Sequence, residues 1–228
     1  GVVKNRRTEV TMNAAVSQSF VLRAHLLWWN DDPFFAGQSA QISIPDGAMA
    51  VGDDGRIAWV GEAANLPNDY TAWPEVDRRG TVVLPGFIDA HLHFPQSAII
   101  GAYGTDLLHW LDTYTFPEES RFGDQAHAAS IAAIFADTLL RYGVTSACVF
   151  STIHPVALED LAAAFHSRGM GLLSGKTAMD RNAIPTLHDT AQSAYDDAKA
   201  LLEALEPQYD RFGYVVTPRF AITSTEAQ

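Results

Sequence analysis

The stretch PGFIDAHLHFPQ, Pro85 to Gln96, places a carboxylate and two imidazoles on a segment that otherwise has the character of a buried strand. Side chains two apart on a strand share a face, so Asp89, His91 and His93 are predicted to project together, with the two histidine Cα atoms about 7 Å apart. Both imidazoles could then reach one zinc ion at about 2.0 to 2.1 Å. The stretch predicts a two-histidine metal clamp with Asp89 as a supporting carboxylate or, alternatively, as a further metal ligand. A pair of core histidines bonded to backbone is the alternative to the clamp.

Downstream of this stretch the pattern alternates strands with amphipathic helices, which is typical of βα units around a parallel sheet. Four such units are expected in residues 84–228, whereas a closed (β/α)8 barrel needs eight. The pattern alone leaves two possibilities, an open doubly wound sheet or half of a barrel. The expected elements are strand 87–93, helix 123–143, strand 144–150, helix 155–169, strand 170–179, helix 189–205 and strand 214–222.

Upstream, residues 20–83 carry short strand patterns and turns and are predicted to form an all-β domain. Asp54-Gly55 between two apolar runs indicates a β-hairpin. Residues 1–19 are polar, without clear periodicity, and are expected to be a mobile arm or a cloning remnant without a function.

The composition limits the partners. The chain has 15 Lys and Arg against 27 Asp and Glu, a net charge of -12, which disfavours binding to nucleic acid or to anionic membranes. No apolar run approaches the roughly 20 residues that span a bilayer. Cys148 is the single cysteine, so no internal disulfide can form. We expect a soluble cytoplasmic protein that does not bind a nucleic-acid polymer.

Several segments resemble one family. VVLPGFIDAHLHFPQ is similar to the first-strand signature of the amidohydrolase superfamily, a TIM-barrel family of metal-dependent hydrolases. HFPQ, LLHWLDTYTFPEESRF, STIHP, MDRNA and VTPRFAI resemble, in this order, the guanine-deaminating members of that superfamily. The resemblance covers residues 20 to 228. It implies an amidohydrolase-type barrel of which about the first four βα units are present, beside a small N-terminal β-sandwich.

The resemblance also implies a reaction and a set of site residues. The reaction is hydrolytic deamination of guanine to xanthine and ammonia, with one zinc ion per active site bound by His91 and His93. His93, Gln96, Arg219 and Phe220 are the implied substrate-binding residues. The residue chemistry agrees, since a guanidinium matches the adjacent O6 and N7 acceptors of guanine and an amide can bind a purine edge. A homodimer is implied by family habit.

Other polar residues have weaker signals. His154 is expected to line the pocket or to make a structural hydrogen bond, and Trp110 to lie in a loop that covers the pocket. Glu118 and Glu119 are expected to be helix-start charges rather than catalytic acids, and the roles of Asp180, Arg181 and Asn182 are left open. No function is expected for the histidines without ligand spacing, which are His25, His109, His127, His166 and His188.

The remaining machinery of the family cannot be assigned in this sequence. A third histidine ligand, a glutamate general acid/base and an aspartate ligand are expected beyond Gln228. Because catalytic zinc usually has at least three protein ligands, the chain by itself is expected to be inactive. The alternatives are another aminohydrolase of the superfamily, of the 8-oxoguanine deaminase or triazine hydrolase type, or a non-catalytic truncated module. Iron in place of zinc is also left open.

Overall fold

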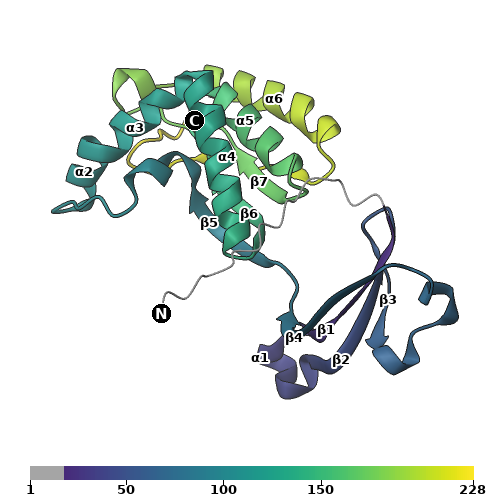
Figure 1. The fold of residues 1–228 in the computed structure, drawn as a ribbon. Helices are drawn as coiled ribbons and strands as arrows, with labels where there is room; N and C mark the ends of the chain where they lie inside the picture. Colours follow the sequence, from purple (N-terminus) through teal and green to yellow (C-terminus); the bar gives the residue numbers. More distant parts are fainter. Residues whose placement is uncertain (1–17) are drawn as a thin grey trace, which may run out of the picture. The chain divides into compact units, whose positions relative to one another are not determined.

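The computed structural model describes residues 18–228, and the chain divides into two compact units, the first ending at Pro85 and the second beginning at Gly86 (Figure 1). The first unit is a four-stranded sheet. The second unit is an α/β layer that carries the His91 and His93 segment. No helix in the described residues is long and apolar enough to cross a bilayer.

The sheet of the first unit has the strand order β3-β2-β1-β4. Strand β1 pairs antiparallel with β2 and parallel with β4. The Asp54-Gly55 hairpin is confirmed between β2 and β3, with Gly55 at φ 75°, a conformation that glycine adopts at little cost. Between residues 18 and 85 the structure shows this one sheet, so a β-sandwich stays a prediction. The elements are β1 (Phe20–Trp29), α1 (Pro33–Ala36), β2 (Gln41–Val51), β3 (Ile57–Glu62) and β4 (Glu75–Val83).

The second unit contains a parallel sheet with strand order β5-β6-β7-β9, and this confirms the α/β prediction. Each connection between these strands contains one long helix, and the three long helices lie side by side over one face of the sheet (Figure 1). The strands are β5 (Phe87–His93), β6 (Val144–Phe150), β7 (Gly171–Gly175) and β9 (Phe212–Tyr214); the connecting helices are α4 (Gln125–Arg141), α5 (Pro155–His166) and α6 (Ala191–Gln208).

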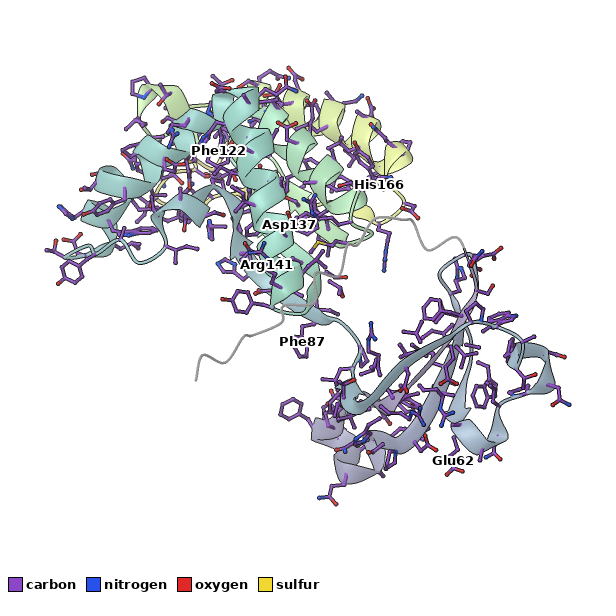
Figure 2. All side chains as sticks on the ribbon, in the orientation of Figure 1. Glu62, Phe87, Phe122, Asp137, Arg141 and His166 are labelled. Atoms are coloured by element: carbon purple, nitrogen blue, oxygen red, sulfur yellow. The ribbon has the colours of Figure 1, made fainter. Side chains whose placement is uncertain are left out.

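The helix ends follow from local sequence. The Asp124 carboxylate accepts hydrogen bonds from two backbone N–H groups in the first turn of α4. Helix α5 has Pro155 at its start and Gly169, at φ 67°, just past its end, as the sequence predicts. Figure 2 shows Phe122 and Arg141 at opposite ends of α4.

The helices and the sheet enclose one apolar core. Phe135 of α4 packs with Phe165 of α5, and Leu172 of β7 is buried beneath the helices. The opposite sheet face is largely uncovered, because Ile88 is 78% and Leu173 51% exposed. Parallel sheets normally have both faces covered. The expectation that the β5 strand is buried is therefore wrong for the described residues, since β5 is an edge strand.

The prediction of one continuous fourth strand over residues 214–222 is also wrong. The chain forms β9 at Phe212–Tyr214 and then a separate two-residue strand, β10 (Thr217–Pro218), which pairs parallel with β8 (Thr177–Ala178). Gly175 permits this bend, because a Cβ there would lie 1.8 Å from the carbonyl oxygen of Val215. The close approach carries the chain from the main sheet into the loops above it.

The segment expected to be a loop around Trp110 is helical. It contains α2 (Leu107–Trp110), a π-helical turn (Leu111–Thr115) and α3 (Phe116–Ser120). Asp106 caps α2 by accepting a hydrogen bond from the backbone N–H of His109 at 2.9 Å. Pro117 in the first turn of α3 is compatible with a helix start. Leu111 and Phe116 of this segment form one buried apolar cluster with Ile153, Met179 and Leu187.

Candidate active site

The two histidines lie at the carboxyl end of β5, where the strand contains a bulge. Asp89 pairs with Ala147 and Leu92 with Val149, so β5 has one residue more than β6 across this interval. The bulge interrupts the simple alternation that the sequence predicts. His91 and His93 line a common cavity, whereas Asp89 lines a different one.

Asp89 acts on the backbone of the bulge. Its Oδ1 accepts a hydrogen bond from the backbone N–H of His91 at 3.1 Å. This contact fixes the residue that carries the first imidazole. The sequence-based role of Asp89, a supporting carboxylate rather than a ligand, remains a prediction.

The two imidazoles are close and nearly perpendicular. Their ring centroids are 5.1 Å apart with an interplanar angle of 76°. Phe150, the last residue of β6, stacks on His93 at 4.7 Å and 12° and meets His91 edge to face at 5.4 Å. Phe150 therefore restricts both rings, a role that sequence reasoning missed because the residue has the pattern of an ordinary core aromatic.

The environment of His93 favours the neutral imidazole. Burial, together with the positive charge of Arg219 and the neighbouring His91, lowers the pKa of His93 to about 4. A neutral imidazole is the form that binds metal ions. His93 is thus in the protonation state that a metal ligand requires over the neutral pH range.

A cavity of about 270 Å³ opens above the imidazole pair. Its wall combines the end of β5, helix α2 and the segment after β10, which are far apart in the sequence. The lining residues are His91, His93, Gln96, Leu107, Trp110, Leu111, Phe150, Arg219 and Phe220. All the sequence-predicted metal-binding and substrate-binding residues therefore meet at one cavity.

A second cavity of about 440 Å³ shares His91, His93, Gln96 and Trp110 with the first and extends along α4 past Ile134 and Thr138. Its wall is mainly apolar, with Leu92, Ile99, Ile100, Phe135 and Leu139 among the lining residues. Trp110 thus contacts both spaces, from a helix rather than from the predicted loop.

Arg219 reaches the cavity from the segment after β10. Its backbone N–H donates to the carbonyl of Ala178 at 3.2 Å, which holds this segment against the end of β8. The guanidinium forms a buried ion pair with Glu119 of α3, and the two side chains are 5% and 1% exposed. Glu119 is indeed in the first turn of a helix, but sequence reasoning missed this partner, which is 100 residues away along the chain.

Gln96 and Phe220 complete the polar and aromatic wall. Gln96 lies in a 3₁₀ helix, Phe94–Ile99, and its Nε2 is 3.3 Å from His93 Nδ1. Phe220 is half-buried against the apolar cluster under α2 and α3.

The Asp180 to Asn182 loop supports the segment after Arg219. Asp180 accepts a hydrogen bond from the backbone N–H of Thr225 at 2.8 Å, and the amide of Asn182 donates to the carbonyl of Ile222 at 2.8 Å. Arg181 donates to the same carbonyl from Nε at 3.1 Å. The three residues therefore bind the chain just beyond Phe220 and do not line the cavity.

His154 lines neither of the two cavities. It lies before the start of α5, and its Nε2 is buried without a hydrogen-bond partner. Burial lowers the pKa of this imidazole, and the nearby Lys176 ammonium adds to the effect. A structural hydrogen bond from the ring, one of the two expectations, is not found for Nε2.

The imidazole pair fits a metal ion as one part of a site. Two imidazoles that line one cavity at a strand end are suitable nitrogen ligands for zinc. Within residues 18–228, no group of three or more His, Cys, Asp or Glu side chains could bind a metal. The two histidines therefore fall short of the three protein ligands that catalytic zinc usually has.

The fold and this site define the class of protein: the chain belongs to the amidohydrolase family, whose model matches residues 82–228. Among its relatives, the guanine deaminase of Escherichia coli K12 is 42% identical over 191 residues, covering 83% of this chain and 43% of that protein. The probable guanine deaminase of Deinococcus radiodurans is 40% identical over 210 residues, covering 90% and 47%. The chain spans about half the length of these relatives.

Solved structures agree with the sequence comparison. The E. coli guanine deaminase superimposes with a TM-score of 0.84 at 38% identity, covering 91% of this chain and 48% of that one. A guanine deaminase from C. acetobutylicum, solved with guanine bound in its active site, gives a TM-score of 0.81 at 26% identity, covering 92% and 48%. These matches extend over both units of the chain.

Proposed function

We propose that this chain forms the part of a zinc-dependent guanine deaminase that binds the purine and supplies two of the metal ligands. The observation that supports the proposal best is the convergence of His91, His93, Gln96 and Arg219 on one cavity. The reaction is hydrolysis of guanine to xanthine and ammonia. His91 and His93 would hold the zinc ion, which when bound would lower the pKa of a water molecule and so make hydrolysis possible at neutral pH.

The residues of this chain would bind and orient the purine. The Arg219 guanidinium donates to the adjacent O6 and N7 acceptors, and the Gln96 amide binds another polar edge of the base. Phe220 closes the apolar side of the ring. Buried hydrogen-bonding groups of this kind discriminate against bases that lack the matching acceptors. His91 and His93 would bind zinc, and His93 would also contact the base.

The proposal includes several features of the whole protein. We expect the second half of a (β/α)8 barrel to cover the exposed face of β5 to β9, and a second sheet to complete a β-sandwich with residues 20–83. The glutamate general acid/base and the remaining ligands are expected beyond Gln228. A homodimer and a cytoplasmic location are further predictions.

The decisive experiment uses the protein expressed from its complete reading frame. We expect deamination of guanine, measured as ammonia release, with little activity on adenine or cytosine. An enzyme that ignores guanine but acts on 8-oxoguanine or a triazine would refute the substrate and retain the family. A protein without hydrolase activity on any of these would favour a non-catalytic module.

Metal content tests the histidine pair separately. Elemental analysis of the purified protein is expected to give about one zinc per chain, and a variant with both His91→Ala and His93→Ala is expected to lose it. Retention of zinc in the double variant would contradict the assignment of these ligands. A finding of iron instead of zinc would correct the identity of the metal and leave His91 and His93 as its ligands.

A further inference from the structure

Glu119 is a buried carboxylate that faces the guanidinium of Arg219 from helix α3. Its Oε2 accepts a hydrogen bond from Arg219 Nη1, whereas its Oε1 is buried without a hydrogen-bond partner. Because the second oxygen has no donor, the carboxylate depends on Arg219 for compensation of its charge. The same helix provides Phe116, whose ring centroid is 5.5 Å from Arg219 Cζ.

These contacts restrict the guanidinium on two sides and leave a third one open. Among the described residues, Glu119 is the acceptor found for the Arg219 side chain, and it engages Nη1 alone. The Nε and Nη2 atoms are not among the fully buried, unpartnered atoms, and Arg219 lines the cavity. Nε–H and one Nη2–H lie on the same edge of a planar guanidinium and form a fork of two parallel donors.

We propose that Glu119 is a positioning residue for Arg219: it holds Nη1, presents the Nε and Nη2 fork to the cavity, and neutralises the guanidinium charge. This inference rests on the proposed function in assigning Arg219 to the substrate. A fixed fork matches a planar base with two adjacent acceptors, because little orientational freedom is lost on binding. A neutralised guanidinium also favours uncharged bases, since an uncompensated buried cation would attract small anions.

A merely structural ion pair would stabilise α3 without affecting which ligands bind. The two roles are separated by variants of the full-length protein. Glu119→Ala removes both the carboxylate and its geometry, and Glu119→Gln keeps an acceptor but removes the charge. Glu118→Gln is the matched control, because Glu118 lies on the same helix and pairs instead with Arg121 at 2.7 Å and His127 at 3.0 Å.

The first readout is the steady-state kinetics with guanine. Glu119→Ala is expected to raise KM by roughly 10- to 100-fold, the size of one lost charge-assisted contact, with a smaller change in kcat. In an Arg219→Ala background the same substitution is expected to change kcat/KM by less than about 3-fold, because the partner it positions is gone. An undiminished effect in that background would show that Glu119 does not act through Arg219.

The second readout needs no turnover and uses nitrate as the probe. Nitrate is expected to raise the Tm of Glu119→Gln and to leave wild type and Glu118→Gln unchanged, since a ligand that binds the folded state stabilises it. Equal changes in Tm on addition of nitrate in all three proteins would overturn the inference. This readout does not use Glu119→Ala, so it remains valid where that variant fails to fold. If wild type does not deaminate guanine, the proposed function fails, and the nitrate result still decides the role of Glu119.

Discussion

Two buried ion pairs lie above the parallel sheet, and they differ in what their cations face. Lys176 directly follows β7 and is 1% exposed; its Nζ is 2.7 Å from Asp189 and 3.6 Å from Asp197. The Arg219 side chain is 5% exposed and, within residues 18–228, forms an ion pair with Glu119 alone. Arg219 lines the cavity beside His91 and His93, whereas Lys176 lines neither this cavity nor the larger one along α4.

The comparison shows that burial by itself does not identify a functional charge. The Lys176 ammonium is a compact charge enclosed by two carboxylates, and its backbone N–H donates to Tyr214 Oη at 3.2 Å. It ties the loop after β7 to the start of α6. The Arg219 guanidinium retains N–H donors that Glu119 does not use, and these are available to a ligand. We therefore expect the Lys176 pair to be structural and the Arg219 pair to be functional.

The largest effect is expected from Lys176→Ala. The substitution leaves the Asp189 carboxylate buried without its partner, which typically costs about 3 to 5 kcal/mol. Urea unfolding measures the loss as a lower midpoint at an unchanged slope. Lys199→Ala, which removes an exposed ion pair with Glu203, is the control and should leave the midpoint in place. A loss below about 1 kcal/mol for Lys176→Ala would contradict the structural role.

Arg219→Ala is expected to act on catalysis. Loss of a buried charge-assisted contact to the base should lower kcat/KM in the complete enzyme. Expressed as a free energy of transition-state stabilisation, the loss should be about 2 to 4 kcal/mol. Combining it with Glu119→Gln limits the accompanying loss of stability, because no unpaired carboxylate is left buried. A loss of transition-state stabilisation below about 0.5 kcal/mol would contradict the assignment of Arg219 to the substrate site.

A pH effect on stability is expected from His154, the imidazole near Lys176. Burial lowers its pKa, and the Lys176 charge adds to this while Asp189 opposes it. The unfolded chain therefore binds a proton more readily, so this contribution is present above the unfolded pKa of about 6.5 and is lost as the pH falls towards the folded pKa. The Tm of His154→Gln should fall less between pH 7 and pH 5 than that of wild type. An equal fall in Tm for the two proteins would contradict this contribution of His154.

The smallest effect is expected from Asp197→Asn. Asp197 is 41% exposed and 3.6 Å from Lys176 Nζ, so solvent screens the interaction and Asp189 remains as the close partner. We expect a change of about 0 to 1 kcal/mol in the free energy of unfolding, again from urea unfolding. A loss as large as that of Lys176→Ala would mean that the two carboxylates share the charge equally.

Much of the second unit could be predicted from local sequence. The strands at β5 and β6 and the helices α4, α5 and α6 follow from hydrophobic periodicity, Asp124, Pro155 and Gly169. The division of the fourth strand into β9 and β10 was missed, because it depends on the close approach of Gly175 to Val215. The bulge in β5 was missed for a similar reason, since the partner strand decides it.

The sequence by itself determined the α/β order of the second unit, the paired histidines at a strand end, and the residue types gathered around them. These are local properties, because spacing along one strand and the chemistry of a side chain do not depend on distant contacts. The tertiary structure decided which carboxylate compensates which cation. Glu119 and Asp189 carry no local mark of their partners, and only the packing of α3 and of the loop before α6 brings each of them to a buried charge. A buried charge needs a partner that lies close to it in the folded protein, and that partner can be far away along the sequence.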